Sequence, residues 1–331
     1  MEKEDVVFSV IMCAYNHERY IAQAIESVVS QETEFKFELI VGEDCSTDGT
    51  RKIVREYQKK YPEIVKPVYY KKNMGGTKNA YCLIKKTRGK YIAACEGDDF
   101  WCDPKRIQND VVFLEQHQEY VGICNRCKVV DVEGKEIKEN IDSKLAFWEF
   151  DKTVYTLGDF EDWKLPGHCS TITTRNIFLD KSLDYRIIYQ ASGRVGDRTG
   201  TLLKVLYGDI YCGKKIVSCY RYRVSATENN FMSQYAEKNL RDEDFLMMRR
   251  LEHWVWKQKG ICLDLGKARR ERFIGSVVVW MKNPTKGNRH VVTRIIKNSG
   301  EPIKYIGYGI KIWILKNYYW KIKHTDKLIT L

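Results

Sequence analysis

The sequence lacks several features that would place it in a familiar class of protein. No uninterrupted apolar run approaches the roughly 20 residues that a membrane-spanning helix needs. The mixed charges of residues 1–5 do not resemble the basic start of a signal peptide. No Gly-x-Gly-x-x-Gly turn follows the first apolar segment, which argues against a dinucleotide-dependent dehydrogenase. These absences predict a cytoplasmic protein that does not cross a membrane.

A disulfide framework and a zinc site are also not expected. The 11 cysteines are scattered along the chain and odd in number, so in the absence of a signal peptide they are interpreted as reduced thiols. Only Cys124 and Cys127 have the spacing of metal ligands, and no second pair accompanies them.

Positive charge is concentrated in the last third of the chain. The formal net charge is +12, and residues 226–331 hold 21 Lys and Arg against 10 Asp and Glu, which is +11 of that total. This asymmetry suggests an anionic partner for the region, either a membrane surface or a nucleic acid. A solvated basic helical surface is the alternative.

The first hundred residues alternate between apolar strands and amphipathic helices. Strands are predicted at 6–14, 37–42, 65–70 and 89–95, with a helix after each of the first three. Such units form an open α/β sheet whose ligand crevice lies beyond the carboxyl ends of the strands. The polar residues expected at that edge are Asn16, Asp44, Asn73, Glu96 and Asp98.

Three carboxylates follow the fourth predicted strand, at Glu96, Asp98 and Asp99. Hard oxygen ligands at the end of a strand suit a divalent cation that shares the phosphates of a substrate. Residues two apart point to the same side of an extended chain, so Glu96 and Asp98 could converge on one ion. The alternative is a polar turn in which Asp103 caps the next helix.

Four ordered motifs resemble the family 2 glycosyltransferases. They are Ser-Val-Ile-Met-Cys-Ala-Tyr-Asn at 9–16, Glu-Leu-Ile-Val-Gly-Glu-Asp-Cys-Ser-Thr-Asp-Gly-Thr at 38–50, Asn-Met-Gly-Gly at 73–76 and Cys-Glu-Gly-Asp-Asp-Phe-Trp-Cys-Asp-Pro at 95–104. The resemblance covers roughly residues 6–225. It implies the α/β GT-A fold, with a Rossmann-like nucleotide-binding half fused to an acceptor half around a mixed sheet. It also implies transfer of a sugar from a nucleotide-diphosphate donor, usually with inversion.

The resemblance implies roles for individual residues on the donor side. Asp44 matches the carboxylate that bonds the nucleobase, and uridine is the expected base. Ala14 and Tyr15 lie where the chain lines the base pocket, and Asn16 and Asn73 belong to the same donor-binding motifs. Asp98 and Glu96 match the Asp-any-Asp motif that holds Mn or Mg on the diphosphate. Glu43 stands where many members carry Asp.

On the acceptor side, Asp197 resembles the catalytic base, which takes a proton from the acceptor hydroxyl. The alternative for Asp197 is a helix N-cap. Arg223 stands where the family often has His, and its guanidinium could bind the diphosphate. His168 and Trp101 are weaker candidates for contact with the acceptor.

The resemblance ends near residue 225, so we expect a catalytic domain at 1–225 and a basic, mainly helical extension at 226–331. Helical periodicity predicts a helix at 240–258, and the segments 269–281 and 291–296 continue the same mixture of basic and apolar residues. The segment 303–323 is rich in Ile, Trp, Tyr and Lys, which is typical of a helix that lies in a membrane interface. Packing on the catalytic domain, or on a second subunit in a homo-oligomer, is the alternative.

Together these features predict a peripheral enzyme on the inner face of the plasma membrane. It would extend a glycan, with a polyprenyl-diphosphate-linked acceptor, in capsule or other surface polysaccharide synthesis. A sugar nucleotidyltransferase is one alternative, although the Gly-rich basic loop expected after its first strand is missing. A nucleic-acid-binding protein is another, but it would leave the acidic sheet edge unexplained, so no nucleic-acid partner is expected.

Overall fold

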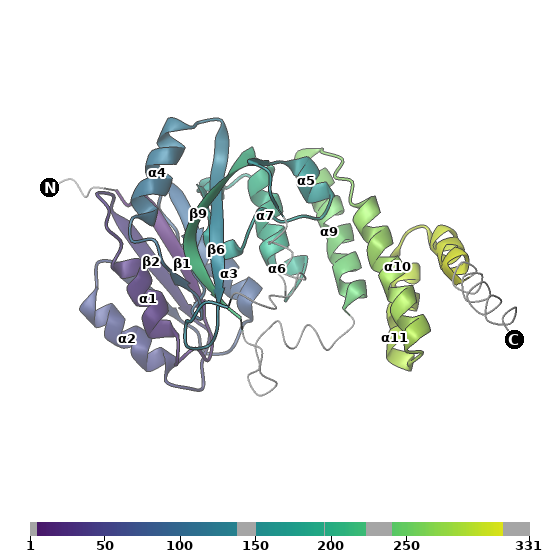
Figure 1. Ribbon diagram of the computed structural model, residues 1–331, viewed down its shortest axis with the longest axis horizontal. Helices are drawn as coiled ribbons and strands as arrows, with labels where there is room; N and C mark the ends of the chain where they lie inside the picture. The colour runs from purple at the N-terminus through teal and green to yellow at the C-terminus, as the bar shows by residue number, and fades with distance from the viewer. Residues whose placement is uncertain (1–4, 138–149, 195, 223–239, 314–331) are drawn as a thin grey trace, which may run out of the picture. The chain divides into compact units, whose positions relative to one another are not determined.

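The computed structural model describes residues 5–137, 150–194, 196–222 and 240–313. It divides into two compact units, Met1–Val224 and Ser225–Leu331. Figure 1 traces the chain through both units. Each unit is described below by itself.

The first unit is built on a nine-stranded sheet, counted over the described residues. The strand order is β3-β2-β1-β4-β8-β6-β9-β5, and β7 pairs with β9 outside this path. The strands are β1 (Phe8–Ala14), β2 (Phe37–Glu43), β3 (Val65–Tyr69), β4 (Tyr91–Ala94), β5 (Phe100–Trp101), β6 (Tyr120–Val130), β7 (Val154–Tyr155), β8 (Ile172–Arg175) and β9 (Asp209–Arg221).

Strands β1 to β4 are parallel to one another, as the apolar runs predicted. Nearly every side chain of β1 is buried, which a strand covered by helices on both faces requires. The register places Ala14 of β1 opposite Glu43 of β2, and Glu43 opposite Tyr69 of β3. The carboxyl ends of these strands therefore reach one edge, where the polar residues of the site begin.

The helices that follow the first three strands, α1 to α3, agree with the predicted pattern. Helix α1 buries Ile21, Ala24, Ile25 and Val28, the spacing of one helical face. The helices are α1 (Ile21–Val29), α2 (Thr50–Lys60), α3 (Gly76–Ile84), α4 (Arg106–Gln116), α5 (Leu157–Glu161), α6 (Ile187–Gln190) and α7 (Asp197–Val205), with 3-10 turns η1 (Cys169–Thr171) and η2 (Ile177–Leu179).

Strand β8 inserts between β4 and β6 and runs antiparallel to both. It pairs Thr173 with Ala93, so the chain just before β8 lies beside the chain just after β4. That arrangement brings η1 and His168 toward the acidic turn after β4. The sheet is therefore mixed: β1 to β4 run parallel, β8 runs antiparallel to both of its neighbours, and β6 and β9 run parallel to each other.

The second unit is helical in the residues that are described. It contains α9 (Arg241–Lys259), α10 (Gly266–Lys282) and α11 (Lys286–Asn298), and residues 302–313 form a further helix. An apolar cluster holds them together, made by Phe245, Phe273, Val277, Val291, Val292, Ile295 and Tyr305. The rest of the predicted helix at 303–323 lies outside the described residues. No helix in the described ranges is long and apolar enough to cross a membrane.

Candidate active site

Asp44 organises the first part of the site, just after β2. The residue is 2% exposed, and its backbone N–H donates to the Ala14 carbonyl at 2.9 Å. Its carboxylate accepts hydrogen bonds from the backbone N–H groups of Met74 at 2.7 Å and Gly75 at 2.9 Å. Asn73 adds a bond to the Gly75 N–H at 3.0 Å. The loop before α3 is thereby fixed against the ends of β1 and β2.

Asn16 joins the loops after β1 and β2. Its backbone has a positive φ of 55°, which Asn tolerates better than most residues. The Asn16 Oδ1 accepts a hydrogen bond from the Thr47 N–H at 2.9 Å, and the Asn16 N–H donates to Ser46 Oγ at 3.1 Å. Ala14 is buried, whereas Tyr15 is 42% exposed and presents its ring at the surface of this edge.

Glu43, which departs from the common family residue, is completely buried. Its carboxylate accepts a hydrogen bond from the Ser46 N–H at 2.7 Å and pairs with Arg51. Arg51 in turn donates to the Tyr70 carbonyl at 2.7 Å. The longer Glu side chain thus connects the end of β2 with α2 and the end of β3, and its contacts account for the substitution structurally.

The acidic turn follows β4. The Asp99 N–H donates to the Glu96 carbonyl at 3.1 Å, which closes the turn. Asp98 is partly exposed, with Oδ2 3.8 Å from His17 Nε2. Glu96 is exposed to solvent, yet the protein around its carboxylate desolvates it. That desolvation, with the nearby Asp98 and Asp197 carboxylates, raises the pKa of Glu96 to about 8.

Asp99 has a different environment from its two neighbours, because it points into the protein. It is 2% exposed, its Oδ1 accepts from the Arg221 N–H at 2.9 Å, and its Oδ2 lies 3.8 Å from His168 Nδ1. Burial, together with the charges of Asp98 and Glu96, raises the pKa of Asp99. Asp99 therefore anchors the turn to β9.

Arg221 binds the backbone of the acidic turn from the protein interior. It was not among the candidate residues predicted from the sequence. The residue is 3% exposed. Its guanidinium donates to the backbone carbonyls of Asp98, Asp131 and Val132 at 2.9, 3.1 and 2.8 Å and to Gln23 Oε1 at 2.7 Å. A planar fork with five N–H groups suits this task better than a lysine would. The available signal in the sequence was its position in the run Tyr-Arg-Tyr-Arg at 220–223, two residues before the candidate Arg223.

His168 lies beside this anchor and is 7% exposed. Its Nδ1 is 2.7 Å from Ser170 Oγ, and its ring centroid is 4.5 Å from that of Tyr220. Burial lowers the pKa of His168 to about 4, against the opposing effect of Asp197 and Asp98. The imidazole is therefore neutral at physiological pH.

Asp197 is the first residue of α7 and is exposed. The N-cap of this helix is Gly196, so the alternative role of Asp197 as an N-cap does not match the structure. The Asp197 carboxylate lies near enough to act electrostatically on both Glu96 and His168. The fold thus brings together three of the predicted acidic residues from two distant segments.

Two other candidates differ from this group. Trp101 is 4% exposed and packs in the hydrophobic core, where its ring offers little surface to an acceptor. The Arg106 guanidinium lies over the Trp101 ring, 4.0 Å from its centroid. Arg223 lies outside the described residues.

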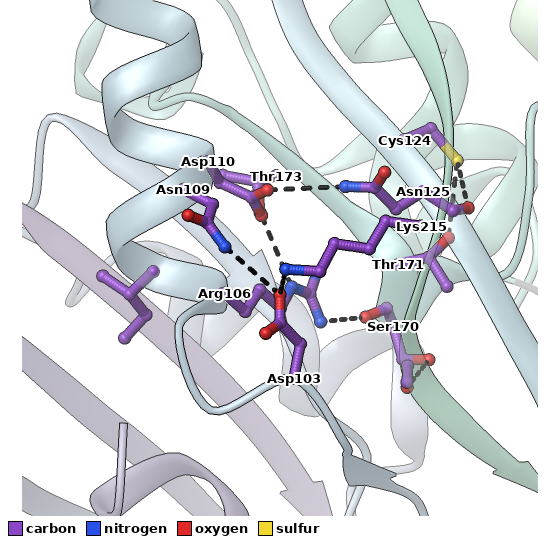
Figure 2. A network of polar contacts seen from close by, with 12 residues as sticks. Asp103, Arg106, Asn109, Asp110, Cys124, Asn125, Ser170, Thr171, Thr173 and Lys215 are labelled. Carbon is purple, nitrogen blue, oxygen red and sulfur yellow. Dashed lines mark hydrogen bonds and ion pairs between the residues drawn. The ribbon is translucent and has the colours of Figure 1, made fainter. Parts of the chain in front are cut away.

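A polar network around Arg106 and Asp110, which Figure 2 shows, reaches Ser170 in the turn that follows His168. Arg106 is fully buried, donates to the Ser170 carbonyl and lies 3.4 Å from Asp110 Oδ2. Asp110 also accepts from Thr173 Oγ1 at 2.6 Å and Asn125 Nδ2 at 3.4 Å. This network connects α4 with η1, β6 and β8, and so fixes the turn that carries His168.

No group of three or more His, Cys, Asp or Glu side chains in the described ranges is arranged to hold a metal ion. Glu96 and Asp98 offer hard carboxylate oxygens of the type that Mg²⁺ and Mn²⁺ prefer. Desolvation, and after it the nearby carboxylates of Asp98 and Asp197, raise the pKa of Glu96, and a bound cation would offset this repulsion between like charges. The donor set therefore fits a cation whose remaining ligands come from substrate or water.

A family model supplies the deciding comparison. The model described as glycosyl transferase family 2 matches residues 9–183, more than half of the chain. The chain belongs to glycosyl transferase family 2. This family 2 enzyme is 35% identical over 131 residues to the uncharacterized protein Rv1520 of Mycobacterium tuberculosis, covering 40% of this chain and 38% of that protein. It is 33% identical over 141 residues to the minor teichoic acid biosynthesis protein GgaB of Bacillus subtilis, covering 42% of this chain and 15% of GgaB.

The chain thus spans well under half the length of these curated relatives. Among solved structures, residues 1–349 of TarS from Staphylococcus aureus in complex with UDP superpose with a TM-score of 0.53 at 20% identity. That superposition covers 81% of this chain and 69% of the TarS chain. The same TarS fragment in complex with UDP-GlcNAc gives a TM-score of 0.51. The family 2 enzyme therefore has the GT-A fold that its motifs predicted.

Proposed function

We propose that this family 2 enzyme transfers a sugar, with inversion, from a UDP-sugar to a glycan acceptor. One observation carries the proposal: the carboxylates of Glu96, Asp98 and Asp197 come from two distant segments and interact, and Asp44 follows β2 at the same edge of the sheet. Family membership supports sugar transfer over nucleotidyl transfer. The TarS structures that contain UDP and UDP-GlcNAc support uridine as the base.

The donor's base would lie against Ala14, Tyr15 and Asn16, with Asp44 and Asn73 at its far side. The exposed ring of Tyr15 offers an aromatic surface next to a buried, fixed carboxylate. A pocket of this kind combines stacking with a few placed polar groups, which is how nucleotide sites obtain specificity. The backbone around Asp44 is already held in place before a ligand arrives.

Asp98 and Glu96 would hold Mn²⁺ or Mg²⁺ on the donor diphosphate. When bound, such a cation neutralises the negative charge that develops on the leaving diphosphate. Asp99 and Arg221 act on this pair indirectly, because they fix the backbone of the turn from the protein side. Arg223 is a further candidate for contact with the diphosphate.

Asp197 would act as the general base. It takes the proton of the acceptor hydroxyl while that oxygen forms its bond to the anomeric carbon. The bond from that carbon to the diphosphate oxygen breaks in the same step, and attack from the opposite side inverts the configuration. His168, neutral and rigidly held, would face the acceptor side.

The acceptor we propose is a lipid-linked glycan in surface polysaccharide assembly. GgaB is named for teichoic acid biosynthesis, and TarS for poly(ribitol-phosphate), which supports an acceptor of the cell surface. A basic second unit, with +11 of the net charge of +12, suits an enzyme that works beside an anionic membrane. We place the catalytic domain at 1–225 and the membrane-facing or oligomerising extension at 226–331.

A thermal-shift screen of UDP, GDP and TDP with their sugars, with and without Mn²⁺, tests the donor part. Asp98→Ala should abolish the Mn²⁺-dependent shift, whereas Asp209→Ala, at an exposed carboxylate at the start of β9, should keep it. Asp197→Asn should keep the shift but slow UDP release from the UDP-sugar by about 100-fold or more. A shift without Mn²⁺ that survives in Asp98→Ala, or full turnover by Asp197→Asn, would contradict these roles.

A further inference from the structure

The helix formed by residues 302–313 has two apolar faces, only one of which is covered. On the covered face, Tyr305 is 2% exposed and its ring meets those of Phe245 and Phe273 edge-on, with centroids 5.5 and 5.1 Å apart. Ile312 packs against the same cluster. These contacts fix the helix to α9 and α10 and set its rotation about its own axis.

The uncovered face carries four large apolar side chains, which we call the outer stripe. Ile303, Ile306, Ile310 and Trp313 are 86%, 46%, 54% and 59% exposed. At about 100° per residue, all four fall within an arc of about 80°. That arc lies opposite the covered face. The exposure is therefore a property of one continuous face.

Positive charge predominates in the sequence around the outer stripe. The described residues 272–313 contain eight Lys and Arg and a single acidic residue, Glu301. Glu301 is paired with Lys304, at 2.9 Å. Lys304 and Lys311 lie together on one side of the helix, about 120–140° around it from the centre of the stripe. An apolar strip that ends in Trp, on a helix that also carries Lys, is the composition of helices that lie in a lipid interface.

We propose that the outer stripe docks on the surface of an anionic phospholipid bilayer, with Ile and Trp in the interface and the lysines beside the headgroups. A second copy of the chain fits less well, because pairing two such regions would bring like charges together. The purpose of the contact rests on the proposed function, since it would hold the enzyme next to lipid-linked acceptors. Its test does not depend on that function.

The test is co-sedimentation of the full chain with vesicles of phosphatidylcholine alone and with about 30% phosphatidylserine. We expect binding to the anionic vesicles, and a loss of about tenfold or more in the partition coefficient for the double variant Ile310→Ser, Trp313→Ser. Trp256→Ser is the matched control, because Trp256 is 62% exposed but lies on α9, outside the stripe. It should bind as the wild type does.

Lys311→Glu provides a second variant that leaves the apolar face intact. It should weaken binding to the anionic vesicles and leave any binding to phosphatidylcholine unchanged. Both variants alter exposed side chains, so the thermal midpoint should stay that of the wild type. Deleting residues 300–331 would be a poorer test, because it also removes Tyr305 from the core of the unit.

Three results would overturn the proposal: no binding by the wild type, wild-type binding by the double variant, or equal binding to both kinds of vesicle. A wild-type dimer that the double variant dissociates, without vesicle binding, would identify a second copy as the occupant instead. Nucleotide binding and UDP release by the double variant separate this proposal from the catalytic one. They should remain at wild-type values whichever way the vesicle experiment turns out.

Discussion

Replacing Arg106 by Met should destabilise the first unit strongly. The Arg106 side chain is fully buried and faces Asp110, which is 2% exposed. Removing one partner of a buried ion pair costs about 3–5 kcal/mol, because the other charge is left uncompensated. Asp110 keeps its hydrogen bonds from Thr173 and Asn125, so we expect a loss near the lower limit, about 3 kcal/mol.

Urea unfolding followed by tryptophan fluorescence measures this loss. The side chain of Trp101, directly beneath Arg106, provides a local probe. The double variant Arg106→Met, Asp110→Asn should lose less stability than the two single variants added together, because it removes both charges. Arg186→Met, which breaks the exposed pair with Asp184, is the control and should leave the midpoint unchanged.

A loss of less than about 1 kcal/mol in the free energy of unfolding of Arg106→Met would refute the reasoning, because breaking an exposed surface ion pair costs no more than that. Strict additivity in the double variant would also refute it, because two coupled charges cannot have independent costs. Arg106→Met should also affect the turn that carries His168, apart from its effect on stability. Without Arg106 the Ser170 carbonyl loses its donor, so the turn that carries His168 should loosen.

Two further predictions concern the acidic turn and its neighbour. The pKa of His168 is lowered in the folded protein, so between about pH 6.5 and 4 the unfolded chain holds more protons and the stability falls as the pH falls. His168→Gln should remove up to about 3 kcal/mol of that fall. Its thermal midpoints at pH 7 and pH 4.5 should therefore lie closer together than those of the wild type. Equal acid sensitivity in both proteins would contradict it. Gly97→Ala would place a Cβ atom 2.7 Å from His17 Nδ1 and 3.0 Å from the Cys13 carbonyl, so the acidic turn must move. The Mn²⁺-dependent thermal shift with nucleotide should therefore weaken. Gly193→Ala meets nothing within 4 Å and should keep the shift; a normal shift in Gly97→Ala would show a turn that tolerates displacement.

The parallel half of the sheet could be predicted from sequence because its signals are local. Continuous apolar runs predicted the four strands, the amphipathic segments between them predicted α1 to α3, and helical periodicity predicted α9. Once these units form a parallel sheet, topology places the ends of β1, β2 and β4 at one edge. The positions of Asn16, Asp44 and Glu96 at that edge could therefore be predicted without any knowledge of their contacts, and their roles in the site stay predictions.

The support behind the site could not be predicted in the same way, because it depends on contacts between distant segments. Trp101 was a candidate for the acceptor side, but Arg106 and the core enclose its ring. Asp99 is in the same turn as Asp98, yet it points inward toward β9. The alternation of side chains along an extended chain does not predict which of the two carboxylates faces the solvent and which one contacts a buried partner.

The contacts of Arg221 can form only after nearly all of the first unit has been synthesised. This side chain bonds Gln23, 198 positions earlier, and the backbone of the acidic turn, about 120 positions earlier. A ribosome must have made almost the whole first unit before those carboxylates can be locked. A fragment cut where the family match ends, at residue 183, would carry every carboxylate of the turn but not the arginine that steadies them.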